Sequence, residues 1–165
     1  MRPSSDELAK RFPGVVAAAH RADLAPLVTR LEPVTFEAGE LYAREGGPAP
    51  GLGLLVSGGF SVELATPGGA SEVLGEVGPG GVLGEVSFLD GGPSSATLRA
   101  TAETNVWRLD MAAFEALASA HPRLAVALLH AMSETLAARI RRAIGRIETA
   151  RPESVRALFG VGGAS

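Results

Sequence analysis

The spacing of apolar residues divides the chain into a helical start, a strand-rich middle and a helical end. Between residues 33 and 110 the apolar runs are short and end at glycine or proline, and Phe60, Val62 and Leu64 alternate with polar or small residues. Such alternation is typical of half-buried strands, and glycine supplies the turns between them. At least seven short strands with frequent turns predict a sandwich or barrel rather than alternating strand–helix units.

The segments on either side have helical spacing. Residues 4–31 are predicted to form short helices, with Asp6 capping the first and Asp23 capping a second over residues 24–31. Asp110 is expected to cap a helix over residues 111–120.

Pro122 suits the first turn of a long helix that is expected from about residue 123 to about residue 147. A short helix is also expected near residues 152–159. The predicted organisation is therefore N-terminal helices at 1–31, a β-barrel at 32–110, C-terminal helices at 111–150 and a tail at 151–165.

Composition narrows the functional classes. The chain has 165 residues, of which 46% are apolar, and this fits one domain with a sizeable core. A net charge of −3 gives no reason to expect nucleic acid or an anionic membrane as a partner. The absence of cysteine excludes disulfides and thiolate chemistry and fits the reducing cytoplasm, which is the expected location. The N-terminus lacks the apolar core of a signal peptide, and no uncharged apolar run approaches the ~18 residues of a membrane span.

The most informative stretch runs from Gly84 to Leu98 and reads GEVSFLDGGPSSATL. Its pattern predicts a short helical turn, a glycine loop and a strand that starts at a polar cluster. Backbone N–H groups at the start of a helix have no partner inside the helix and can face a phosphate. Glu85 can accept a hydrogen bond from a ligand hydroxyl.

This stretch resembles the phosphate-binding cassette of the cyclic-nucleotide-binding domain family, the sensor domains of the catabolite activator protein type. Five other motifs follow the family's order, and these are Phe36–Glu40, Arg44-Glu45-Gly46, Leu54–Phe60, the approach to the cassette at Val77–Glu85, and His121-Pro122 with Leu124, Leu128 and Leu129. The resemblance spans roughly residues 24 to 142. It implies an eight-stranded jelly-roll β-barrel with N-terminal helices and a long C-terminal helix. It also implies a site for cyclic AMP or cyclic GMP, the candidate ligands, formed by Gly84, Glu85, Val86, Ser94, Ser95, Ala96 and Thr97.

One position departs from the family pattern, because Ser94 stands where the family has an arginine that grips the cyclic phosphate. A neutral hydrogen bond contributes ~0.5–1.5 kcal/mol and one to a charged group ~1.5–3 kcal/mol. Loss of the arginine cation therefore predicts at least about tenfold weaker binding of a cyclic nucleotide. Arg99 lies five positions further on and faces the other way in a regular strand, so it is expected to be solvated or salt-bridged. The segment from Glu32 to Asp110 holds eleven acids and three bases, which disfavours an anionic ligand.

The long helix carries a wide apolar stripe, made of Leu128, Leu129, Met132, Leu136, Ile140, Ala143, Ile144 and Ile147. Such a stripe can pack on the barrel and on a partner helix, so a homodimer or another partner protein is expected there. Arg139, Arg141, Arg142 and Arg146 cluster on the same helix, but without interleaved aromatic residues. Only about twenty residues follow Ile147, too few for a helix-turn-helix, so DNA binding is not expected.

No catalytic constellation is recognisable, and an enzyme is not expected. The three histidines, His20, His121 and His130, lie outside the strand zone, so neither catalytic nor metal-binding residues are assigned. Two hypotheses stay open. The chain is a regulatory domain with a degenerate cassette that acts through protein–protein contacts, or it is a genuine small-ligand sensor that signals by movement of the C-terminal helix.

Overall fold

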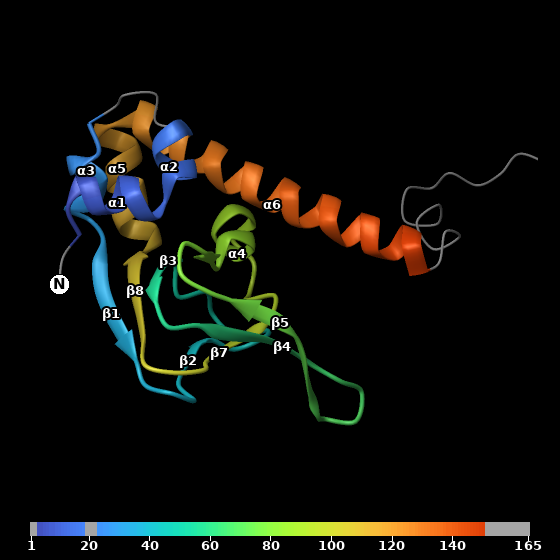
Figure 1. Cartoon of the computed structure of the whole chain (residues 1–165). Coiled ribbons are helices and arrows are strands. Elements are labelled where there is room, and N and C mark those ends of the chain that lie inside the picture. Colours follow the sequence, from blue (N-terminus) through green and yellow to red (C-terminus); the bar gives the residue numbers. More distant parts are fainter. Residues whose placement is uncertain (1–2, 19–22, 151–165) are drawn as a thin grey trace, which may run out of the picture. The chain divides into compact units, whose positions relative to one another are not determined.

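The computed structural model describes residues 3–18 and 23–150 (Figure 1). The chain forms two compact units, Met1–Met132 and Ser133–Ser165, and helix α6 (Pro122–Ala150) contributes residues to both. The short helix expected near residues 152–159 and most of the expected tail lie outside the described residues.

Three short helices precede the strands: α1 (Ser5–Arg11), α2 (Pro13–Ala18) and α3 (Ala25–Val28). The expected cap at Asp6 is wrong, because Ser4 caps α1. The Ser4 hydroxyl accepts from the Glu7 N–H, and the Glu7 carboxylate accepts from the Ser4 N–H, which together form a capping box.

The predicted helix over residues 24–31 is shorter than expected. Asp23 does accept a hydrogen bond from the Ala25 N–H at 2.9 Å. The last bond that reaches four residues back runs from the Thr29 N–H to the Ala25 carbonyl, and the N–H groups of Arg30 and Leu31 bond three residues back, so the α-helix ends at Val28.

Eight strands follow, as the resemblance implies, in two antiparallel four-stranded sheets of order β1-β8-β3-β6 and β2-β7-β4-β5. Their bounds are β1 (Glu32–Phe36), β2 (Leu41–Ala43), β3 (Leu52–Ser57), β4 (Phe60–Ala65), β5 (Ser71–Val77), β6 (Val82–Leu83), β7 (Thr97–Ala100) and β8 (Thr104–Leu109). The predicted jelly-roll fold is confirmed, and its two sheets do not close into one continuous barrel. The edge strands β2 and β6 have three and two residues, too short to join the two sheets by a hydrogen-bonded ladder.

Two apolar clusters stabilise the sheets. The first lies between the two sheets, where the rings of Phe36, Tyr42 and Phe60 meet edge to face, with centroids 5.5 to 5.8 Å apart. On the other face of β8, Trp107 and Leu109 pack with residues of the helices. Val106 belongs to the inter-sheet cluster, so both faces of β8 are buried.

The remaining helices are α4 (Glu85–Asp90), α5 (Met111–Ala120) and α6. Asp110 caps α5 as predicted, since its carboxylate accepts from the Ala113 N–H at 2.7 Å. Leu124, Leu128 and Met132 of α6 are buried in the helix-side cluster. Within the described residues, none of the helices combines the length and apolar character that a membrane crossing requires.

Candidate ligand site

Helix α4 of the predicted cassette is bounded by two glycines in the left-handed region. Gly84 has φ +71° and Gly91 has φ +70°. A Cβ at Gly84 would lie 2.5 Å from the carbonyl oxygen of Gly51, so a side chain there is excluded by space as well as by φ. Gly84 therefore seats the start of α4 against the loop that precedes β3.

The rest of α4 is tied to α5 and to the chain that follows. Phe88 is buried and meets Phe114 of α5 edge to face, with centroids 5.2 Å apart. The Ser87 hydroxyl donates to the Pro93 carbonyl at 2.9 Å, and the Gly91 N–H donates to the Ser87 carbonyl at 3.0 Å. These contacts place the end of the helix close to the segment that contains Ser94.

Ser94 is only 7% exposed. Its backbone pairs with the turn at residues 44–47, which contains the separate motif Arg44-Glu45-Gly46. The Ser94 N–H donates to the Gly47 carbonyl at 2.9 Å, and the Ser94 carbonyl accepts from the Gly46 N–H at 2.8 Å. The Thr97 hydroxyl accepts from the Glu45 N–H at 3.0 Å. The turn at residues 44–47 is thereby held against the cassette. Ser95 is exposed, and Val86 and Ala96 are half-buried.

Glu85, the first residue of α4, is 4% exposed and lies within electrostatic reach of Tyr42. The Tyr42 hydroxyl donates to the Gly51 carbonyl at 2.9 Å. Burial raises the pKa of Tyr42 above its ordinary value, the Arg108 guanidinium opposes this shift, and the Glu85 carboxylate adds to it. Tyr42 therefore lies within electrostatic reach of both Glu85 and Arg108.

Sequence reasoning missed Tyr42. No local pattern could have found it, because its position depends on a close approach to Gly53, where a Cβ would lie 2.8 Å from the Tyr42 hydroxyl oxygen. The ligand roles predicted for Gly84, Glu85, Val86 and the residues from 94 to 97 stay predictions.

Two of the three arginines between Glu32 and Asp110 are engaged in ion pairs. The Arg99 Nε lies 3.1 Å from Glu63 Oε1, and its Nη1 donates to the Gly39 carbonyl at 3.1 Å, so the expected salt-bridged role is confirmed. Arg108 pairs with Glu32, while its buried Nε has no hydrogen-bond partner among the described residues. Arg44 is exposed at the start of the turn that pairs with Ser94.

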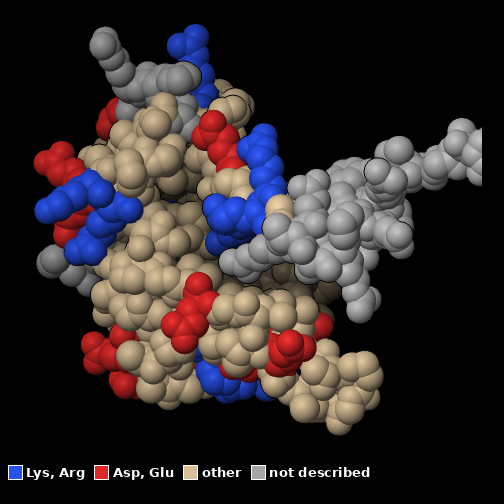
Figure 2. All heavy atoms as spheres, turned by 45° about the vertical axis from the view of Figure 1, so that its right-hand side comes forward, with Lys and Arg blue, Asp and Glu red and all other residues tan. Residues whose placement is uncertain are grey.

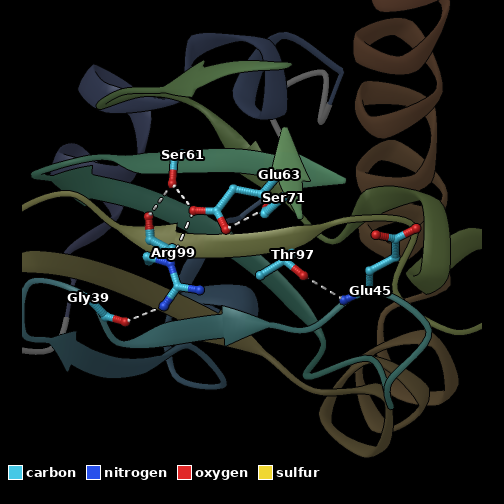
Figure 3. Close-up of polar contacts among 7 residues, drawn as sticks. All are labelled: Gly39, Glu45, Ser61, Glu63, Ser71, Thr97 and Arg99. Atoms are coloured by element: carbon cyan, nitrogen blue, oxygen red, sulfur yellow. Dashed lines mark hydrogen bonds and ion pairs between the residues drawn. The ribbon is translucent and has the colours of Figure 1, made fainter. Parts of the chain in front are cut away.

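Glu63 lies at the centre of a polar network on the β2-β7-β4-β5 sheet, which sequence reasoning also missed (Figure 3). Its carboxylate accepts from the Ser61 hydroxyl at 2.8 Å, from the Ser71 hydroxyl at 3.2 Å and from Arg99. The Ser61 hydrogen bond, with those of Arg99 and Ser71, holds the pKa of Glu63 below its ordinary value despite the opposing effect of burial. The network depends on the pairing of β4 with β7, which puts Ser61 opposite Arg99.

Acidic side chains are spread over the lower, strand-built part of the face in Figure 2. Their distribution agrees with the excess of eleven acids over three bases between Glu32 and Asp110. The segment that builds the two sheets therefore carries net negative charge.

Two antiparallel sheets, a short helix between left-handed glycines and a strand that begins at a polar segment define a domain of the jelly-roll class. Residues 33–121 match the family model described as the cyclic nucleotide-binding domain. This match covers more than half of the chain, and the chain therefore belongs to the cyclic nucleotide-binding domain family.

Regulators and fused enzymes are both found among its relatives. The chain is 28% identical over 131 residues to a CRP-like cAMP-activated global transcriptional regulator of Mycobacterium tuberculosis, covering 79% of this chain and 58% of the regulator. It is 35% identical over 94 residues to acetyltransferase Pat of Mycolicibacterium smegmatis, covering 57% of this chain and 28% of the enzyme. The chain thus spans between about a quarter and three fifths of these relatives' lengths.

Solved structures agree with this assignment. A cyclic nucleotide-binding domain from Methylobacillus flagellatus has a TM-score of 0.72 at 24% identity. The match covers 87% of this chain and 85% of that chain, and it supports the fold. The Thermus thermophilus catabolite activator protein has a TM-score of 0.64 at 25% identity, with 88% of this chain and 63% of that chain covered.

Proposed function

We propose that the chain is a cytoplasmic, non-catalytic regulatory domain whose cassette does not bind cyclic nucleotides tightly and which acts by contacting protein partners. The observation that carries the proposal is the serine at position 94. An arginine offers a planar, charged and often bidentate contact to a phosphate, which a hydroxyl cannot reproduce. Arg99 is held by Glu63, and Arg108 is held by Glu32, so neither is free to replace the missing cation without breaking an ion pair.

The local charge supports the same proposal. A cyclic nucleotide carries one negative charge, and Glu85 lies buried at the start of α4. An anion brought to this end of the sheets meets a negative potential from the surrounding acids, and no arginine at position 94 offsets it.

One observation favours the second candidate, a small-ligand sensor that uses Glu85, Ser94, Ser95 and Thr97. The two backbone hydrogen bonds between Ser94 and the turn at residues 44–47 bring the chain at Arg44 next to the cassette. Arg44 is exposed, and its long side chain gives it the reach to contact a bound anion from this turn. Binding would then shift the population between two positions of the C-terminal helix.

Calorimetric titration of the intact chain with cyclic AMP and cyclic GMP tests the leading proposal. We expect no saturable heat at micromolar nucleotide, because the charge-assisted phosphate contact is missing. Micromolar binding by the wild type would overturn the degenerate-cassette proposal. In that case Arg44→Gln should weaken binding by about tenfold if Arg44 supplies the cation, while Arg141→Gln on α6 should leave it unchanged.

The partner surface proposed for this function is the second half of α6. Leu136, Ile140 and Ile144 recur at intervals of four residues, and Ile140 is 51% exposed. An apolar row of this kind on a helix is suited to pairing with the same row of a second chain.

We therefore expect light scattering to report a dimer for the wild type and a monomer for Leu136→Glu, since a carboxylate in an apolar helix pair is strongly unfavourable. Arg142→Glu, which introduces the same side chain on the opposite side of the helix, should remain dimeric. A monomeric wild type would end the proposal of self-association.

A further inference from the structure

A hollow of about 340 Å³ lies at the junction of α3, α5 and α6, entirely within the first compact unit. It is lined by Asp23, Pro26, His121, Pro122, Arg123 and Leu124. None of these residues belongs to the cassette between Gly84 and Thr97. Small-molecule sites occupy about 300–1,000 Å³, so the hollow is suited to a ligand at the small end of that range.

The apolar part of the lining comes from two prolines and a leucine. Leu124 is 3% exposed, and Pro26 is half-buried at the start of α3. Pro26 and Pro122 carry no backbone N–H, so these walls offer no amide donor. The lining therefore favours a ligand with an apolar body over a sugar-like ligand that needs many hydrogen bonds.

The polar part of the lining carries both signs of charge. Asp23 supplies a carboxylate whose Oδ1 is oriented by the Ala25 N–H at 2.9 Å. Arg123 supplies an exposed guanidinium that makes no side-chain hydrogen bond or ion pair with the other described residues. His121, two residues before Arg123, adds an imidazole that can donate a hydrogen bond.

We propose that this hollow is a binding site for a free apolar α-amino acid. The ligand ammonium pairs with Asp23, its carboxylate pairs with Arg123, and its side chain lies against Pro26, Pro122 and Leu124. This ligand class uses both charges and the apolar wall. A dicarboxylate would put its second negative charge near Asp23, and an uncharged apolar molecule would leave both charges without a partner.

Such a site would be independent of the cassette and of its proposed loss of nucleotide affinity. Pro122, Arg123 and Leu124 form the first turn of α6, and His121 caps the end of α5. A ligand that bridges α3 to this turn stabilises one arrangement of the α5–α6 junction, which gives a regulatory domain a second input.

The test is titration of the intact chain, by calorimetry and by chemical-shift mapping, with leucine and phenylalanine as probes. N-acetyl-leucine removes the ammonium, and leucinamide removes the carboxylate. Asp23→Asn removes the charge and keeps an oxygen for the Ala25 N–H, and Arg123→Gln removes the cation. We expect each change, in the ligand or in the protein, to weaken binding by about tenfold or more.

The paired changes give the decisive comparison. If the contacts are as proposed, Asp23→Asn costs little further affinity for N-acetyl-leucine, and Arg123→Gln costs little further affinity for leucinamide. Arg141→Gln, far along α6 from the hollow, should bind leucine as the wild type does. No binding of either amino acid by the wild type at millimolar concentration overturns the proposal, and so does binding that neither variant changes. Ser94→Arg should leave leucine binding unchanged, so failure here is distinguishable from failure of the function proposed for the cassette.

Discussion

Replacing Ser94 with arginine is expected to raise the affinity for cyclic AMP or cyclic GMP by about tenfold. A hydrogen bond to a charged group contributes about 1–1.5 kcal/mol more than a neutral one, and 1.4 kcal/mol corresponds to a factor of ten in affinity. The backbone of residue 94 keeps its two hydrogen bonds to Gly46 and Gly47 whatever the side chain. The substitution therefore restores the cation without moving the segment that carries it.

Calorimetry on Ser94→Arg, beside Ser95→Arg as the matched control, measures this gain. Ser95 is exposed one residue further on, so its arginine adds the same charge with the side chain in solvent. Thermal unfolding must show that Ser94→Arg remains folded, because residue 94 is nearly buried. A folded Ser94→Arg that binds neither nucleotide would show that more than the cation has been lost. An equal gain of nucleotide affinity in Ser95→Arg would show that the effect comes from non-specific electrostatic attraction and not from a contact at position 94.

The sequence predicted the class of fold well, because short apolar runs bounded by glycine constrain local structure strongly. The alternation at Phe60, Val62 and Leu64 matches β4, and Asp110 caps α5 as expected. The period of two along a strand also predicted that Arg99 faces away from the site and is solvated or salt-bridged. Its ion pair with Glu63 confirms the salt-bridged role.

What the sequence could not predict depends on contacts between distant segments. Sheet closure depends on how strand edges meet, and the short strands β2 and β6 leave two open sheets. The position of Tyr42 depends on its approach to Gly53, eleven residues away, and no local pattern encodes that contact. The hollow brings Asp23 beside Arg123, which is a hundred residues away along the chain.

Loss of the Glu63 carboxylate is expected to destabilise the domain more than loss of any exposed acid on the same sheet. Glu63→Leu removes the carboxylate to which the Ser61 and Ser71 hydroxyls donate and leaves Ser61 with only the longer hydrogen bond to the Arg99 carbonyl, at 3.3 Å. Each hydrogen bond lost contributes about 0.5–1.5 kcal/mol. Arg99 adds little to this cost because its side chain is 45% exposed and water can solvate it. Urea unfolding at neutral pH measures the difference, with Glu76→Leu on the exposed strand β5 as the control.

The same carboxylate makes part of the stability dependent on pH. Its pKa is lower in the folded chain than in the unfolded chain, so at intermediate pH the unfolded state binds more protons. The contribution is complete above the ordinary glutamate pKa of about 4.3 and is lost as the pH falls through the lower, folded-state value. Glu63→Gln cannot titrate at this position, so its unfolding free energy should fall less than that of the wild type between about pH 5 and about pH 3. Glu76→Gln, at an exposed position, serves as the reference. If the unfolding free energies of the wild type and Glu63→Gln change with pH in parallel, the Ser61, Ser71 and Arg99 contacts do not stabilise the charged form of Glu63.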